Sequence, residues 1–157
     1  ESSVLSSLFK SHPYESVAYE TYTLENGNQF IGMGMIGDLE EKISENDFIN
    51  FVKKTMKSDL IRHSKFINKP IKKVAVLAGS GSFAIESAKL AKADAFITSD
   101  LKYHDFFKAE NELLLLDIGH YESEQYTKKV LEAYLKKKIP NFAILLSKIN
   151  TNPVKYK

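Results

Sequence analysis

Runs of apolar residues alternate with segments of helical periodicity over the second half of the chain. The runs predict strands at 74–79, 94–99, 112–118 and 142–147, and the segments between them predict helices at 82–93, 101–111 and 121–138. Strands that are apolar along their whole length are covered on both faces, and alternation of strands with helices gives parallel pairing. The pattern therefore predicts an α/β fold with a largely parallel sheet and helices on both faces.

The N-terminal part of the chain follows a different pattern. It predicts, in order, a helix at 2–11, a strand at 17–24, a turn at 25–28, a glycine-rich strand at 29–37 and a strand at 60–67. Ser44 and Asp47 form a capping box that opens a further helix, and that helix buries Phe48 and Val52.

Composition narrows the class of protein. With 157 residues, 43% of them hydrophobic, the chain can bury one sizeable core. The formal charge of +2 and the mixing of lysines with glutamates leave no basic stripe, so nucleic acid is not an expected partner. The absence of cysteine excludes disulfides and thiolate ligands, so a metal would need imidazole and carboxylate.

Targeting signals are also missing from this sequence. No segment approaches the roughly 20 apolar residues that cross a bilayer, and the first residues do not read as a secretory signal. No membrane association is expected, and the expected location is cytoplasmic.

Three polar segments follow predicted strands, at the sheet edge where α/β proteins bind ligands. The first comprises Gly79, Ser80, Gly81 and Ser82, whose backbone N–H groups could meet an anion beside a helix N-terminus. It lacks the GxGxxG spacing and the lysine of a P-loop. It fits either an anion site or a tight turn that needs glycine.

The second segment is "SDLKYHD". Asp100 and His104 are four residues apart and share one face of the predicted helix, which suits metal ligation or a hydrogen bond to a residue that ligates a metal. Asp100 is equally suited to the N-cap of that helix. Both interpretations remain open.

The third segment is "DIGHYESE", which ends a buried strand. Projected at about 100° per residue, His120 and Glu124 lie on the side of Leu131 and Leu135 that should face the sheet, and Glu122 points the opposite way. A buried carboxylate needs a partner. A metal shared with His120 would supply one, and a direct hydrogen bond between His120 and Glu124 is the alternative.

A family resemblance rests on these segments in this order. "VAVLAGSGSFAIESA", "DAFITSDLKYHDF" and "LLLLDIGHYESE" resemble the C-terminal half of the GTP cyclohydrolase 1 type 2 homologues, the Ngg-interacting-factor-three-like, dinuclear metal-centre hexameric proteins. "SHPYESVAYETYTLEN" and "GMGMIGDL" resemble the stretch before it in longer bacterial members, where a PII/CutA-like insert ends. The resemblance implies that residues 1–26 end this insert and that residues 27–157 are the C-terminal half of the metal-centre domain.

The resemblance also implies an architecture and a site. Family members have two similar α/β halves, a homo-oligomer in the form of a hexameric toroid, and two adjacent divalent metals. His120 and Glu124 match metal ligands, whereas the remaining ligands belong to the other half and have no counterpart here. Asp100 and His104 match residues that line the cavity. Imidazole and carboxylate suit zinc, iron or manganese.

The implied function is a metal-dependent hydrolase of a nucleotide-like or otherwise phosphorylated small molecule. In this scheme His120 and Glu124 hold metal, residues 79–82 and Asp100 contact the substrate, and His104 is the candidate catalytic residue for proton transfer. The alternative is a non-catalytic ring that stores or senses metal or binds other proteins. No residue selects guanine, so the substrate stays unassigned.

Overall fold

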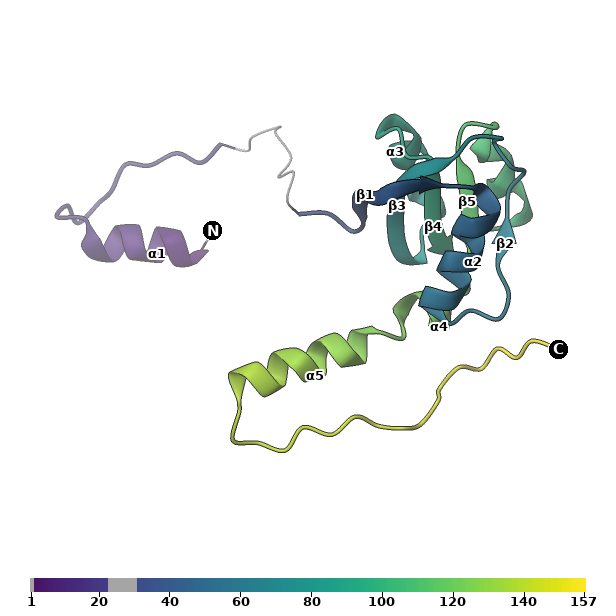
Figure 1. Cartoon of the computed structure of the whole chain (residues 1–157). Coiled ribbons are helices and arrows are strands. Elements are labelled where there is room, and N and C mark those ends of the chain that lie inside the picture. Colours follow the sequence, from purple (N-terminus) through teal and green to yellow (C-terminus); the bar gives the residue numbers. More distant parts are fainter. Residues whose placement is uncertain (1, 23–30) are drawn as a thin grey trace. The chain divides into compact units, whose positions relative to one another are not determined.

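The computed structural model describes residues 2–22 and 31–157 (Figure 1). It divides into two units, residues 1–32 and 33–157. In the first unit, α1 (Ser2–Ser11) confirms the predicted helix. The predicted strand at 17–24 is wrong for residues 17–22, which have no strand to pair with among the described residues of this unit. Its last two residues, the turn at 25–28 and the first two residues of the next strand lie outside the described residues.

A five-stranded sheet forms the centre of the second unit, with strand order β1-β3-β4-β5-β2. The strands are β1 (Met35–Ile43), β2 (Arg62–His63), β3 (Ile71–Ser80), β4 (Ala95–Ser99) and β5 (Leu114–Asp117). The three central strands are parallel, and the edge strands β1 and β2 pair antiparallel with their neighbours. The prediction of a largely parallel sheet is confirmed for its centre.

Both faces of the sheet are covered, as the apolar strands predict. Helix α2 (Glu45–Met56) contributes Phe48 and Val52 to one face, while α3 (Ile85–Leu90) and the 3₁₀ helix η2 (Tyr103–Ala109) cover the other. The buried strand residues on the α2 face are Ile71, Val74, Ala95, Ile97, Leu114 and Leu116. Strand residues on the α3 face are Ala75, Leu77, Phe96 and Leu115.

Local sequence signals explain where α2 begins. The Ser44 hydroxyl oxygen accepts the N–H of Asp47 at 3.1 Å, as the capping box predicts. A single 3₁₀ turn, η1 (Ser82–Ala84), precedes α3 and shortens that helix. None of the helices in the described residues is long and apolar enough to cross a membrane.

Two strand predictions need correction. The strand predicted at 60–67 is reduced to Arg62–His63, and the strand predicted at 142–147 is absent from the described structure. An apolar run becomes a strand only where a neighbouring strand pairs with its backbone, and none of the described strands pairs with residues 142–147. Phe142 and Leu145 are consequently exposed.

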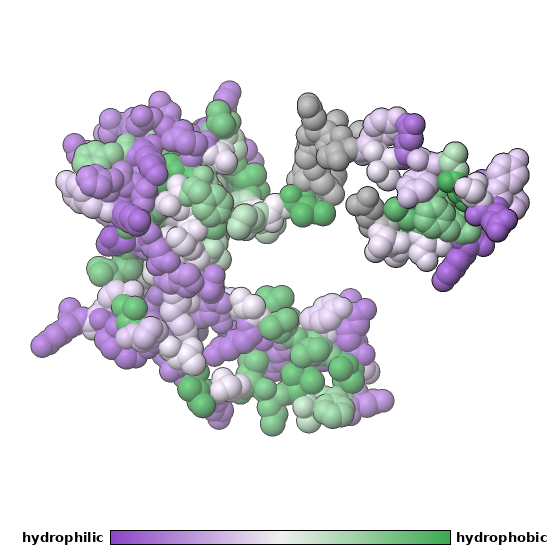
Figure 2. All heavy atoms as spheres, turned by 180° about the vertical axis from the view of Figure 1, so that it is seen from behind, coloured by the Kyte–Doolittle hydropathy of each residue, from purple (hydrophilic) through white to green (hydrophobic). Residues whose placement is uncertain are grey.

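The single helix predicted at 121–138 is two helices, α4 (His120–Glu124) and α5 (Thr127–Lys138). The break is held by α2, because Gln125 donates to the Met56 carbonyl at 3.0 Å and Tyr126 to the Thr55 carbonyl at 2.9 Å. Helix α5 has no buried residue, and Figure 2 shows hydrophobic surface over it. The prediction that Leu131 and Leu135 face the sheet is therefore wrong.

Candidate functional site

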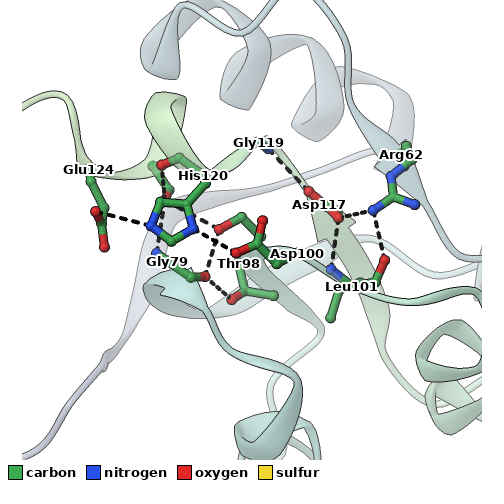
Figure 3. Close-up of polar contacts among 11 residues, drawn as sticks. Arg62, Gly79, Thr98, Asp100, Leu101, Asp117, Gly119, His120 and Glu124 are labelled. Carbon is green, nitrogen blue, oxygen red and sulfur yellow. Dashed lines mark hydrogen bonds and ion pairs between the residues drawn. The ribbon is translucent and has the colours of Figure 1, made fainter. Parts of the chain in front are cut away.

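Polar residues gather where the three parallel strands end (Figure 3). Gly79 lies near the end of β3, Asp100 follows β4, and His120 begins α4 just after β5. Asp100 is not the N-cap of η2, which is Lys102. Its φ of 56° instead places Asp100 in the left-handed region, which aspartate tolerates better than most residues.

His120 contacts a carboxylate through each ring nitrogen. Its Nδ1 donates to Asp100 Oδ2 at 2.6 Å, and its Nε2 lies 3.3 Å from Glu124 Oε2. An ionised carboxylate can only accept, so the bond to Asp100 puts a proton on Nδ1. In the neutral ring, the lone pair of Nε2 then points toward Glu124.

The three side chains are about half exposed, at 52% for His120, 46% for Asp100 and 50% for Glu124. Glu124 is therefore not a buried carboxylate that requires a partner, contrary to the expectation from the sequence. The hydrogen bond to Asp100 raises the pKa of His120 above its ordinary value; burial opposes this, and the charges of Asp100 and Glu124 reinforce it.

Glu122 is the buried glutamate of this segment, although the helical projection pointed it away from the sheet. Its side chain accepts a hydrogen bond from Asn152 Nδ2 at 3.1 Å, so the C-terminal segment covers it. The projection fails because α4 ends after five residues, and its orientation is therefore not set by the apolar face of α5.

The loop at residues 79–82 uses its glycines for backbone geometry and close packing. Gly79 has a φ of +69°, and a Cβ there would lie 2.6 Å from Glu124 Oε1. Its N–H donates to Ser123 and its carbonyl accepts from Thr98 and Ser99, so neither group faces outward. A Cβ on Gly81 would lie 2.1 Å from Thr98 Oγ1. The arrangement fits the tight turn; Ser80 is exposed and Ser82 half-buried.

His104 lies on η2 beside two aromatic rings. Its ring centroid is 5.3 Å from that of Tyr103 and 6.4 Å from that of Phe107. The structure brings Asp100 to His120 through their side chains, but no hydrogen bond joins His104 to Asp100 among the described contacts.

Asp117 is a site residue that sequence analysis did not single out. It is 5% exposed and accepts the N–H of Leu101 at 3.0 Å, the N–H of Gly119 at 3.1 Å and a hydrogen bond from Arg62. The available signal was a lone carboxylate at the end of an otherwise apolar strand, since burying a charge requires partners.

A cavity of about 830 Å³ adjoins Asp100, His120 and Glu124. Its lining includes Asp100, His120 and Glu124 and residues of the C-terminal segment, among them Asn152 and Tyr156. Its four carboxylates outnumber its two basic side chains, Arg62 and Lys128, so its formal charge is negative. Such a cavity favours cations.

The donor atoms suit one divalent ion. Ligands at about 2.1 Å from a tetrahedral metal lie about 3.4 Å apart, close to the 3.3 Å between His120 Nε2 and Glu124 Oε2. Asp100 holds the other ring nitrogen, as carboxylates behind metal-binding histidines do. The set is incomplete, since no group of three or more potential ligands occurs in the part of the chain that the structure describes.

Comparisons with known proteins agree with one another. A model of the family Duf34/NIF3 (NGG1p interacting factor 3) matches residues 6–153. The GTP cyclohydrolase 1 type 2 homolog of Staphylococcus epidermidis is 35% identical over 155 residues, which are 96% of this chain and 42% of the relative. A crystal structure of a Bacillus cereus protein related to NIF3 has 32% identity and a TM-score of 0.74 over 99% of this chain and 44% of that one.

A Staphylococcus aureus crystal structure has 26% identity and a TM-score of 0.78, over 99% of this chain and 46% of that one. The chain thus spans about two fifths of the length of the curated relatives it matches. The family match covers most of the sequence, including all three segments at the strand ends. This chain belongs to the Duf34/NIF3 family.

Proposed function

We propose that His120 and Glu124 hold a divalent metal ion, zinc, iron or manganese, in a hydrolase site for a nucleotide-like or phosphorylated small molecule. The observation that carries the proposal is the 3.3 Å separation of His120 Nε2 and Glu124 Oε2, with Asp100 on the opposite ring nitrogen. The name of the relatives, GTP cyclohydrolase 1 type 2 homolog, supports chemistry on small phosphorylated molecules. Residues outside this chain would complete the ligand set and hold a second metal.

The residues of this chain have separate tasks in the proposal. Asp100 keeps the proton on Nδ1 of His120 and so leaves Nε2 free to coordinate. Glu124 contributes the negative charge that a divalent ion needs nearby. When bound, such an ion polarises a phosphoryl oxygen and lowers the pKa of water.

The charge of the cavity explains why a metal belongs in this proposal. Asp100, Glu122 and Glu124 repel a phosphorylated molecule, and Arg62 is already engaged by Asp117. A cation between His120 and Glu124 would reverse this repulsion. The backbone groups of Gly79 are internally paired, so we assign the phosphate to the metal rather than to residues 79–82.

The test has two steps. Calorimetric titration with Zn²⁺ and Mn²⁺ compares the parent chain with the His120→Ala, Glu124→Ala double variant and with a control that replaces two exposed residues outside the site, His63 and Glu41, with alanine. We expect binding in the parent and control and none at this site in the double variant. Equal affinity in all three proteins would end the ligand assignment.

Turnover is measured next, with nucleotides and phosphate monoesters in the presence and absence of metal. Metal-dependent hydrolysis that the double variant loses supports the enzyme. Metal binding without turnover of any compound by the full-length protein would instead favour the storing or sensing ring. The hexameric assembly stays a prediction, and light scattering of the full-length protein tests it.

A further inference from the structure

One buried carboxylate holds the backbone next to both members of the His120–Asp100 pair. Asp117 Oδ2 accepts the N–H of Leu101, and Asp117 Oδ1 accepts the N–H of Gly119. Leu101 directly follows Asp100, and Gly119 directly precedes His120. Figure 3 shows Asp117 between these two loops, on the side away from Glu124.

The two loops have backbone conformations that need such support. Asp100 has a φ of 56° and Gly119 a φ of 90°, so each loop turns through the left-handed region beside the pair. For a residue with a side chain this conformation costs about 1–2 kcal/mol, and it persists where neighbouring contacts hold it. The two charge-assisted hydrogen bonds to the Asp117 carboxylate stabilise these backbone conformations.

Arg62 joins a third strand to the same carboxylate. Its guanidinium binds Asp117 Oδ2 and also donates to the Leu101 carbonyl at 2.7 Å, and it lies 5.4 Å from the centroid of the Phe106 ring. Leu101 is therefore held at its N–H by Asp117 and at its carbonyl by Arg62. These two contacts fix the loop that carries Asp100, because they hold both polar backbone groups of Leu101.

We propose that Asp117 is a positioning residue that sets the hydrogen bond between His120 Nδ1 and Asp100 and so aims His120 Nε2 at Glu124. That this geometry serves metal binding rests on the proposed function. The geometry itself can be measured without any metal, so a failure of the metal assignment and a failure of this inference give different results.

The test reads the proton on the His120 ring. In metal-free protein, at a pH where the imidazole is neutral, long-range ¹H–¹⁵N NMR spectra separate the Nδ1–H and Nε2–H tautomers. A His120→Gln variant assigns the signals. We expect the parent to show the Nδ1–H tautomer and Asp117→Asn to lose much of it, because the amide that replaces the carboxylate cannot accept all three hydrogen bonds.

Asp94→Asn is the matched control. Asp94 also accepts two backbone N–H groups, from Lys72 and Lys73, and pairs with a cationic side chain, Lys69, but it lies at the opposite end of β4. If Asp117 contributed only to the stability of the fold, the two variants should show the same change in the His120 tautomer. We expect Asp94→Asn to be destabilised while its His120 tautomer stays that of the parent.

Each result of these measurements either supports or overturns the role of Asp117. Parent-like His120 signals in folded Asp117→Asn, or equal changes in both variants, would overturn the inference. If Asp117→Asn does not fold, Arg62→Ala replaces it, since the Arg62 side chain is 53% exposed and its removal should leave the fold intact. A smaller shift of the tautomer ratio in Arg62→Ala supports the inference, and an unchanged ratio refutes it.

Discussion

Replacing Gly79 with alanine should change metal affinity and the stability of the fold through two different effects. The φ of +69° at Gly79 imposes a backbone cost of about 1–2 kcal/mol on any residue with a Cβ. The new Cβ would also lie 2.6 Å from Glu124 Oε1 and 3.6 Å from His120 Cε1. The second distance is ordinary contact, whereas the first forces the carboxylate to move.

The consequences for stability and for binding differ. Glu124 is half exposed, so its carboxylate can swing away cheaply and adds little to the loss of stability. That movement separates Glu124 from His120, however, and one of the two proposed ligands is lost. We expect the free energy of unfolding to fall by about 1–2 kcal/mol and the affinity for Zn²⁺ or Mn²⁺ to fall at least about tenfold.

Urea unfolding and calorimetric metal titration measure the two effects. Gly34→Ala is the control, because its Cβ would lie 2.6 Å from the Val76 carbonyl oxygen, away from His120 and Glu124. It should cost about 1–3 kcal/mol of stability while metal affinity is kept. A Gly79→Ala protein that binds metal as the parent does would refute this reasoning about Glu124.

Three further predictions concern the fold. Burial raises the pKa of Asp94, but hydrogen bonds from two backbone N–H groups and a lysine outweigh it and lower the pKa below its ordinary value. The parent should therefore exceed Asp94→Asn in stability above the unfolded-state pKa of about 3.9, and urea unfolding should show this advantage vanish as pH falls through the lower folded-state pKa. Leu116→Ala, at a fully buried position, should cost about 2–5 kcal/mol, while Leu131→Ala on α5, 55% exposed, should change unfolding by less than about 0.5 kcal/mol; equal losses would contradict the burial pattern. Ser44→Ala should lower thermal stability by about 1 kcal/mol through loss of the α2 cap, and an unchanged melting temperature would count against the cap.

The central sheet could be read from the sequence because its signals are local. Uninterrupted apolar runs specify β3, β4 and β5, and Ser44 marks the start of α2. The strand expected at 142–147 could not be excluded in this way, since pairing depends on whether the folded chain brings the segment alongside a strand, which no local pattern reveals. The break after Glu124 likewise depends on contacts of Gln125 and Tyr126 with α2, which lies about 70 residues earlier in the sequence.

The candidate site was predictable in part. Helical spacing brought His120 and Glu124 together, and the structure places their side chains 3.3 Å apart. Asp100 was expected either to share a helix face with His104 or to cap that helix, but it lies in a left-handed turn before η2 and its side chain contacts His120 instead. Asp117 was overlooked because two of its three partners, Arg62 and Leu101, lie 55 and 16 residues away, and sequence spacing contains no trace of these contacts.

Anomalous diffraction from crystals grown with Zn²⁺ or Mn²⁺ can locate the metal ion that we propose between His120 and Glu124. We expect a peak about 2.0–2.2 Å from both His120 Nε2 and a Glu124 oxygen, with Nδ1 still bonded to Asp100. A metal bound elsewhere, or a His120 ring turned away from Glu124 in crystals that contain the ion, would contradict this proposal.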